Sequence, residues 1–409
     1  IIKFHYMKEK TIVCISCYFK GYDFMDEMKQ LGNKIILIAS ENTKEKNWPW
    51  HAIDEVYYMS EVEPSVWNLE HLVQGFSYLM KSTKIDVVVA LDDYDVEKAA
   101  LIRETFRIPG MGQTTQRYFR DKLAMRQMAK DSGINVPEFS SIFNDETVAE
   151  FVDDVAAPWV LKPRSEASAT GIIKIKSKEE LHKAIDDLGE KRHHFLLESF
   201  KPGDVFHVDS LVYNNDIVFV SASQYLSPPM EVSHDGGIFR TKTLDKNSPE
   251  FKALEQSNSI VLKSFGLKNG ATHTEFIRGK ESGKWYFLET SSRVGGAHIP
   301  DLVEAATGIN LWREWARIEN AWLKNATYQL AKPKELFAGL IICLSKEKNP
   351  DFKEFEQPEV YKFLPMDYHV GLVYQSEDAN KIQELLDDAA YKINDHHLNI
   401  LPPKSKPTS

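Results

Sequence analysis

The first part of the chain alternates short, continuous apolar runs with longer segments in which apolar residues recur every three or four positions. The runs predict buried strands, and the periodic segments predict helices. Expected strands lie at 11–18, 34–39, 55–59 and 86–91, and expected helices at 23–31 and 66–81. Apolar strands that alternate with helices are typical of a parallel sheet covered on both faces. We therefore predict a doubly wound parallel-sheet α/β domain over residues 7–110.

From residue 111 onward the pattern becomes a mixture of α and β elements. A helix is expected at 120–131, and Ser177 with Glu180 has the spacing of a capping box for a second helix that reaches residue 187. Short strands are expected at 159–163, 170–175, 194–197, 205–213, 217–221, 271–278 and 284–289. A helix at 302–306, strands at 337–344 and 369–375, and a helix at 379–393 follow. This part is predicted to be α+β.

Two of the expected strands carry a candidate metal site. The glycine-bracketed polar segment 279–283 joins them, which predicts a β-hairpin. If the turn centres on Ser282, Glu275 lies opposite Glu289, with Cβ atoms roughly 5 Å apart. Carboxylates this close repel each other unless a cation or a shared proton compensates, and Mg²⁺ is commonly held by one or two carboxylates together with phosphates. Two solvated strand ends are the alternative.

The residues after Glu289 favour the metal hypothesis. Arg293 supplies a fixed cation for phosphate or carboxylate oxygens. Gly295 and Gly296 allow a ligand to approach the backbone N–H groups closely. A metal, an arginine and a glycine loop together indicate a polyphosphate site.

Composition limits the class of protein. The 409 residues exceed what one hydrophobic core usually serves, and 43% hydrophobic and 27% charged residues are typical of a globular protein. The net charge of -10 and the pI near 5.8 argue against a general nucleic-acid binder, which would carry a basic domain. No apolar run approaches the roughly 20 residues that cross a bilayer. We therefore expect no nucleic-acid partner, no membrane contact and a cytoplasmic location.

Cys14 and Cys17 satisfy the C-x-x-C spacing of redox and zinc sites. On the expected strand their side chains would point to opposite faces, and no second such pair or Cys/His cluster completes a set of four zinc ligands. We therefore predict that both cysteines are buried and structural.

With these features in view, the sequence resembles the ATP-grasp superfamily over nearly its whole length. In members that look like this, one lysine follows an aspartate and a second precedes a proline; here Lys122 follows Asp121, and Lys162 stands before a proline. The resemblance implies that both lysines contact the phosphates of ATP. The loop after Lys162 carries Ser168 and Gly171, with small residues where other members have several glycines, so its backbone amides can still cover phosphates.

Further ATP contacts are implied by the same resemblance. Glu198, Ser199 and Phe200 look like the hinge at which backbone groups meet the adenine edge, although Phe200 could equally belong to the core. His207 and Asp209 occupy a strand position that touches the ribose or phosphates in many members. A buried strand histidine with satisfied hydrogen bonds is the alternative for His207.

The metal site also fits the family pattern. Glu275, Glu289 and Arg293 match E…E-x-N-x-R, with Ser291 where asparagine is usual. The implied cofactors are ATP and Mg²⁺, with Mn²⁺ as a second option. Because a serine hydroxyl reaches less far than an amide oxygen, the number of bound metal ions is left open.

The implied architecture is a Rossmann-like domain over 7–110 followed by an ATP-grasp fold, in which two α+β subdomains clamp ATP. The first subdomain, with the ATP lid, would span 111–200. The second, with the metal site, would span 201–325. A C-terminal α+β subdomain over 326–409 would pack on this core.

The resemblance implies an ADP-forming carboxylate–amine ligase, in which an amine displaces phosphate from an acyl phosphate. Arg293 and the backbone near Gly296 would stabilise the oxyanion. Arg240 would add a cation from the substrate-facing segment 223–240, with a surface ion pair as its alternative. The small Ala297 favours a dipeptide-forming enzyme, so the expected partners are small carboxylates and amines such as amino acids. A homodimer is one option for the assembly.

Two other functions remain open. A carboxylase that activates bicarbonate, similar to biotin carboxylase, would use the same ATP site. A regulatory protein that binds ATP without turnover is kept open by Ser291. For the ligase, His273 or His234 could accept the amine proton.

Overall fold

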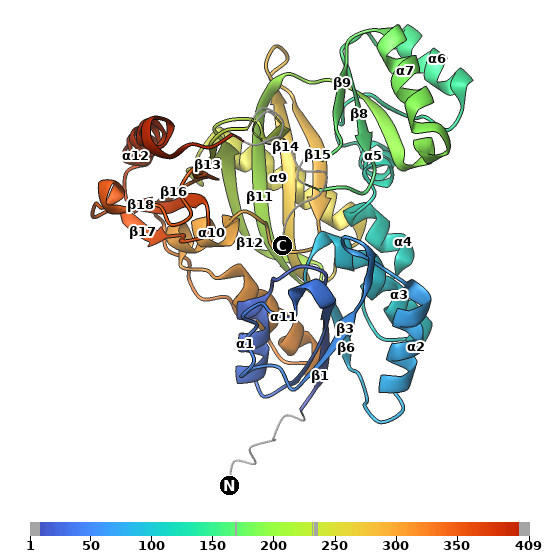
Figure 1. Ribbon diagram of the computed structural model, residues 1–409, viewed down its shortest axis with the longest axis vertical. Helices are drawn as coiled ribbons and strands as arrows, with labels where there is room; N and C mark the ends of the chain where they lie inside the picture. The colour runs from blue at the N-terminus through green and yellow to red at the C-terminus, as the bar shows by residue number, and fades with distance from the viewer. Residues whose placement is uncertain (1–8, 168–169, 231, 233–235, 401–409) are drawn as a thin grey trace.

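The computed structural model describes residues 9–167, 170–230, 232 and 236–400 (Figure 1). Ser168 of the predicted phosphate loop and His234 of the substrate-facing segment lie outside the described residues. Among the helices that are described, none is long and apolar enough to span a bilayer.

The N-terminal part contains a four-stranded parallel sheet in the order β3-β2-β1-β6. Its strands are β1 (Thr11–Ser16), β2 (Lys34–Ser40), β3 (Glu55–Met59) and β6 (Val87–Ala90). Its helices are α1 (Tyr22–Gln30), α2 (Leu69–Leu79) and α3 (Val96–Phe106). One face packs against α1 and the other against α2 and α3. The predicted doubly wound parallel sheet is confirmed.

The two cysteines of the C-x-x-C pattern are buried in different cores of this domain. Cys14 packs with Phe24 on one face of the sheet, and Cys17 packs with residues of α2 and α3 on the other. Both side chains are fully buried and neither is in a disulfide. This arrangement confirms the prediction of structural cysteines.

The helix expected at 66–81 begins later in the structure. Val66–Trp67 forms a short strand, β5, that pairs with β4 (Glu61–Glu63). The helix α2 begins at Leu69, because the Asn68 side chain accepts a hydrogen bond from the His71 N–H and so caps the first turn.

A second, small sheet forms the lobe at the upper right of Figure 1. Its strand order is β7-β10-β8-β9, with β7 (Phe139–Ser141), β8 (Trp159–Pro163), β9 (Ile173–Ile175) and β10 (Phe195–Ser199). Helices α6 (Asp145–Asp154) and α7 (Lys178–Leu188) pack against one face. The predicted cap of α7 is confirmed, since Ser177 Oγ accepts from the Glu180 N–H at 3.2 Å. Helix α5 (Lys122–Asp131) leads into this lobe and is capped by Asp121.

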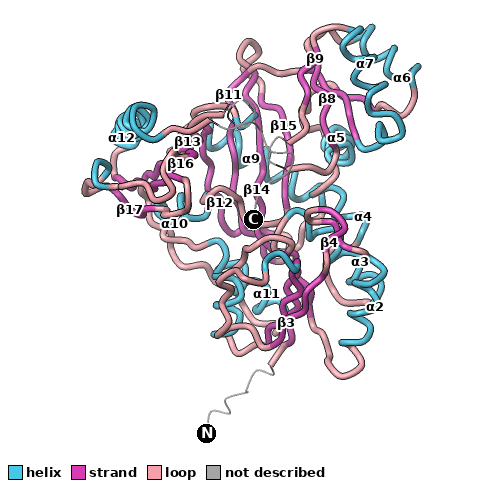
Figure 2. The backbone as a smooth tube through the Cα atoms, in the orientation of Figure 1, coloured by secondary structure: helices cyan, strands magenta, loops and turns pink. Residues whose placement is uncertain are grey.

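The largest sheet has eight antiparallel strands in the order β15-β14-β11-β12-β13-β16-β18-β17 (Figure 2). The strands are β11 (Gly203–Tyr213), β12 (Asp216–Tyr225), β13 (Phe239–Thr243), β14 (Gly270–Gly279), β15 (Trp285–Ser291), β16 (Phe337–Leu344), β17 (Val360–Phe363) and β18 (His369–Ser376). Because β13 pairs with β16, the C-terminal strands extend the central sheet and do not form a sheet of their own.

Four of the described helices pack on the large sheet, and one of them also packs against the N-terminal domain. They are α9 (Pro249–Phe265), α10 (Ile299–Thr307), α11 (Leu311–Leu323) and α12 (Ala379–Lys392). Helix α11 packs beside α1, where the Phe24 and Trp315 rings lie 5.0 Å apart, and Arg313 pairs with Asp23 and Asp26. One continuous apolar core therefore spans the parallel sheet and the large sheet.

We expect Phe24→Ala to lower the free energy of unfolding by about 3–5 kcal/mol, because it removes a fully buried ring at the contact of α1 with α11. Urea denaturation followed by tryptophan fluorescence measures the change. Tyr78→Ala removes an aromatic ring that is 74% exposed and should change stability by less than about 0.5 kcal/mol. Equal effects of the two substitutions would contradict the packing described here.

Candidate active site

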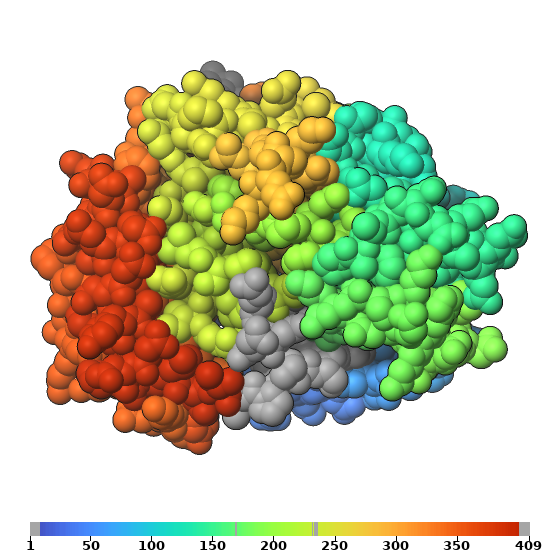
Figure 3. Space-filling model, turned by 90° about the horizontal axis from the view of Figure 1, so that it is seen from above, coloured from blue at the N-terminus to red at the C-terminus, as the bar shows by residue number. Residues whose placement is uncertain are grey.

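A cavity of about 820 Å³ lies where the small lobe, the large sheet and the N-terminal domain meet. Figure 3 looks onto the face where the lobe of α6 and α7 approaches the strands of the large sheet. The cavity wall includes most of the predicted ATP and metal residues: Lys122, Lys162, Glu198, Ser199, Phe200, Glu275, Glu289, Ser291, Arg293 and Gly296. Residues separated by up to 174 positions in the sequence, from Lys122 to Gly296, therefore share one cavity.

The predicted opposition of Glu275 and Glu289 across the β14–β15 hairpin is confirmed. Nearer the turn the register is shifted by one residue, since Phe276 pairs with Phe287. A β-bulge between these two pairs restores the predicted register. The consecutive residues Leu288, Glu289, Thr290 and Ser291 all line the cavity.

The two glutamates have different partners. The Tyr225 hydroxyl donates a hydrogen bond to Glu275 Oε1 at 2.9 Å. The Lys122 ammonium lies 2.9 Å from Glu289 Oε2. Although burial opposes the charge of Glu289, Lys122 and Lys162 lower its pKa below the usual value. Glu289 is therefore an anion in the cavity wall.

Lys162 forms an ion pair with Glu198, whose other carboxylate oxygen lies 2.6 Å from Arg126 Nε. Burial lowers the pKa of Lys162 to about 8, with a smaller contribution from Arg126, while Glu198 opposes the shift. Lys122 also donates to the Glu166 carbonyl oxygen at 2.6 Å. Lys122 and Lys162 are thus each held at the cavity wall by contacts with carboxylate or carbonyl oxygens.

The segment predicted as an adenine hinge lines the cavity, but two of its backbone donors are already used. The Ser199 N–H donates to the Glu138 carbonyl at 2.8 Å, and the Phe200 N–H donates to the Pro158 carbonyl at 3.0 Å. The Phe200 ring faces the Lys174 ammonium, which lies 3.7 Å from its centroid. A base bound here would have to meet other groups of the hinge.

Glycines play different roles at the two loops of the cavity. Gly171 has a φ of 71°, and a Cβ at this position would lie 3.0 Å from Pro163 Cγ. Gly296 lines the cavity, and a Cβ there would meet nothing within 4 Å. At Gly295 a Cβ would lie 3.0 Å from Asp209 Oδ1, so this glycine is required for close packing against the strands rather than for ligand approach.

The prediction that Arg240 joins the active site is not supported by its position. Its neighbour Phe239 lines the cavity, and side chains alternate between the faces of a strand. Arg240 instead pairs with Asp387 of α12, with Nη1 2.9 Å from Oδ1. The alternative given by the sequence, a surface ion pair, describes this arginine.

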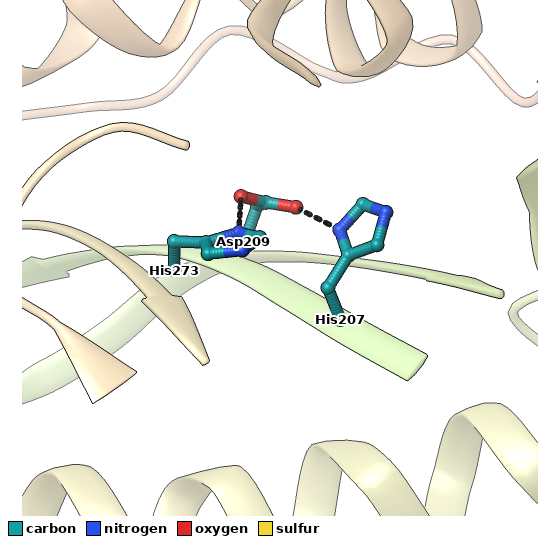
Figure 4. A group of neighbouring side chains, drawn as sticks. All are labelled: His207, Asp209 and His273. Atoms are coloured by element: carbon teal, nitrogen blue, oxygen red, sulfur yellow. Dashed lines mark hydrogen bonds and ion pairs between the residues drawn. The ribbon is translucent and has the colours of Figure 1, made fainter. Parts of the chain in front are cut away.

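His207 and Asp209 do not line the cavity either; they lie in a buried hydrogen-bond chain with His273 (Figure 4). Asp209 Oδ2 accepts from His207 Nδ1 at 2.7 Å, and Asp209 Oδ1 accepts from His273 Nδ1 at 2.9 Å. His207 Nε2 lies 2.8 Å from Thr241 Oγ1. Each carboxylate oxygen of Asp209 accepts a hydrogen bond from a histidine. His207 and Asp209 therefore support the sheet beneath the cavity.

Of the three residues in this hydrogen-bond network, His273 is the one that lines the cavity. Its Nε2 lies 3.6 Å from Glu275 Oε1 and 3.5 Å from the Tyr225 hydroxyl. Burial opposes the imidazolium, but Asp209 and Glu275 outweigh it and raise the pKa of His273 to about 9. A histidine that is already protonated near neutral pH is poorly suited to accept the amine proton, so this structure favours an electrostatic role for it.

Asp93 is the main residue of the cavity that the sequence interpretation missed. It follows β6 in a short 3₁₀ turn, Asp93–Asp95, and accepts from Arg293 Nε at 2.9 Å. Both side chains are buried. The sequence contains a signal that could have identified Asp93, because Asp92, Asp93 and Asp95 follow an expected parallel strand. Ligands of doubly wound sheets bind beyond the carboxyl ends of such strands.

These features define a class of site. Lysines from a small antiparallel sheet and its leading helix face paired carboxylates on a large antiparallel sheet, an arrangement suited to Mg²⁺ and nucleotide phosphates. Residues 155–301 match the family model described as ATP-grasp domain. The chain therefore contains an ATP-grasp domain.

Two relatives are ligases. The chain is 27% identical over 335 residues to the L-arginine-specific L-amino acid ligase of Bacillus subtilis, covering 80% of this chain and 78% of the relative. It is 22% identical to a D-alanine–D-alanine ligase of Neisseria gonorrhoeae, covering 49% of this chain and 66% of the relative.

Solved structures show the same fold over nearly the whole chain. The L-amino acid ligase from Bacillus licheniformis superposes with a TM-score of 0.69 at 19% identity, covering 96% of this chain and all of the other. The N5-carboxyaminoimidazole synthetase from Staphylococcus aureus, complexed with ADP, gives 0.70 at 14% identity, with 94% and 98% covered. Biotin carboxylase from Campylobacter jejuni gives 0.68 at 17% identity, with 96% and 92% covered.

We expect nucleotide affinity to fall as the pH rises through about 8, because Lys162 loses its charge there. Isothermal titration with a non-hydrolysable ATP analogue should show Kd rising by about tenfold between pH 7 and pH 9. Lys162→Arg should flatten this dependence, since a guanidinium stays protonated. The same slope in both proteins would contradict the role of Lys162.

Proposed function

We propose that the protein is an ATP-dependent carboxylate–amine ligase that forms an amide or peptide bond through an acyl phosphate. The observation that carries the proposal is the shared cavity, in which Lys122 and Lys162 face the Glu275–Glu289 pair with Arg293 beside them. The ligase relatives support it.

The residues present fit ATP and Mg²⁺. Glu275, Glu289 and Ser291 offer only oxygen atoms, which are the ligands that Mg²⁺ prefers, and Mn²⁺ accepts the same set. Lys122 and Lys162 would hold the phosphates. Without ligand, each lysine pairs with a carboxylate, and another cation could replace the lysine as the partner of that carboxylate. Bound ATP would supply the phosphoryl group that activates the carboxylate.

The remaining residues would position the substrates and stabilise charge. Arg293 is fixed by Asp93 and by the Val294 carbonyl, so its guanidinium is preorganised for the oxyanion of an acyl phosphate. Gly296 leaves room for a substrate beside it. Tyr225 and His273 hold Glu275 in its orientation.

The segment 223–240 supports the assignment of a substrate compartment. Its described residues in the cavity wall are mostly apolar: Tyr225, Pro228, Pro229, Met230, Val232 and Phe239. Apolar walls with a few placed polar groups are typical of sites for small molecules. Small carboxylates and amines such as amino acids fit this compartment.

We expect ADP release to require both a carboxylate and an amine. A coupled assay over pairs of amino acids with Mg-ATP should show amine-dependent turnover. Turnover that depends on bicarbonate instead would assign the protein to the carboxylases. ATP binding without phosphate release under any of these conditions would favour a regulatory protein.

Glu289→Gln should lower kcat/KM for Mg-ATP by at least about 100-fold, because it removes an anionic metal ligand opposite Glu275. Glu281→Gln makes the same change at the exposed hairpin turn and should leave the rate within about twofold. Steady-state rates over a range of Mg²⁺ concentrations compare the two variants. An unchanged rate for Glu289→Gln would refute its metal role.

A further inference from the structure

Asp93 has a buried carboxylate oxygen without a partner. Its side chain lines the cavity and is only 4% exposed. Arg293 occupies Oδ2 through both Nε and Nη2, whereas Oδ1 has no hydrogen-bond partner among the described residues. A buried carboxylate oxygen of this kind is costly, and ligand binding is one reason for a protein to keep it.

The neighbouring guanidinium also has donors to spare. A guanidinium carries five N–H groups. Arg293 uses Nε and Nη2 for Asp93 and Nη1 for the Val294 carbonyl, which leaves two N–H groups on a side chain that lines the cavity. A free anionic acceptor and free cationic donors therefore lie side by side, which complements a ligand with an ammonium next to a carboxylate.

The position of Asp93 and Arg293 fits a binding site for the carboxylate substrate better than a binding site for the attacking amine. Arg293 follows the hairpin that carries Glu275 and Glu289, and Asp93, Arg293 and Glu289 line the same cavity. A carboxylate facing Arg293 would thus be near the phosphate to be transferred. The attacking amine must be neutral, whereas Asp93 would hold an ammonium in its charged form. Asp93 therefore suits an ammonium that does not react.

We propose that Asp93 binds the α-ammonium group of an amino acid whose carboxylate faces Arg293, which makes an α-amino acid the acyl donor. This inference rests on the proposed ligase function. A carboxylate oxygen of the amino acid attacks the γ-phosphorus and ADP leaves. The nitrogen of the acceptor then displaces phosphate from the acyl carbon and loses one proton.

Hydroxylamine replaces the unknown acceptor in the test, because it converts an acyl phosphate into a hydroxamate and phosphate. The experiment compares each L-amino acid with the carboxylic acid that has the same side chain and no α-amino group. We expect kcat/KM for hydroxamate formation to be about 100-fold higher with the amino acid, the range of one hydrogen bond to a charged group. Equal values for the two would overturn the inference while leaving the ligase function intact.

Asp93→Asn tests the residue itself. It should lower kcat/KM for the amino acid by about 100-fold, mainly through KM, and bring the two substrate classes within about tenfold of each other. Asp92→Asn removes one charge from the same turn and can still cap the Tyr94 N–H, so it should keep the wild-type ratio. The same collapse in both variants, or an unchanged ratio in Asp93→Asn, would contradict the assignment.

Two further results keep the test decisive. If Asp93→Asn fails to fold, as judged by its thermal melt, the wild-type comparison of amino acids with desamino acids still decides the inference. Hydroxamate from no carboxylate at all would overturn the ligase proposal, and the inference with it.

Discussion

The charges in the wall of the cavity are buried, and most of them are balanced by opposite charges from other parts of the chain. Lys122 of α5 pairs with Glu289 of β15, and Asp93 of the N-terminal domain pairs with Arg293 beyond the hairpin. Lys162 and Glu198 bridge adjacent strands of the small lobe. Breaking a buried pair leaves an uncompensated charge, so the Lys122–Glu289 and Asp93–Arg293 pairs restrict how the three parts of the molecule can be arranged.

The same pairs explain how one set of residues can serve both the free and the liganded protein. A lysine that meets phosphate needs a positive charge in a buried place, and without ligand that charge needs a carboxylate. A carboxylate that binds Mg²⁺ needs a negative charge in a buried place, and without the metal that charge needs a cation. In the proposed ligase, the Lys122–Glu289 pair would satisfy both charges until Mg-ATP brought its own, and this exchange of partners would keep the cost of binding low.

Local pattern predicted the parallel sheet and the hairpin, because each depends on a short stretch of sequence, whereas the two lysines were identified through the family resemblance. The helix α9 was not predicted, although Ser248, Pro249 and Gly266 are ordinary start and stop signals. Arg240 was placed from the composition of its segment and His207 from the resemblance, and neither source gives the face of the strand; the alternatives, a surface ion pair and a buried histidine, describe the two residues. Which face of the sheet lines the cavity depends on the register of the strand and on the packing of distant elements against the sheet. The Asp93–Arg293 contact joins residues 200 positions apart, and no local pattern encodes it.

The central claim is that the carboxylates of the hairpin bind the metal that carries the ATP phosphates. A crystal structure with Mg²⁺ and a non-hydrolysable ATP analogue tests it most directly. We expect Mg²⁺ at about 2.1 Å from oxygens of both Glu275 and Glu289, with Lys122 and Lys162 on the phosphates. Nucleotide bound away from the hairpin, or metal bound without either glutamate, would contradict it.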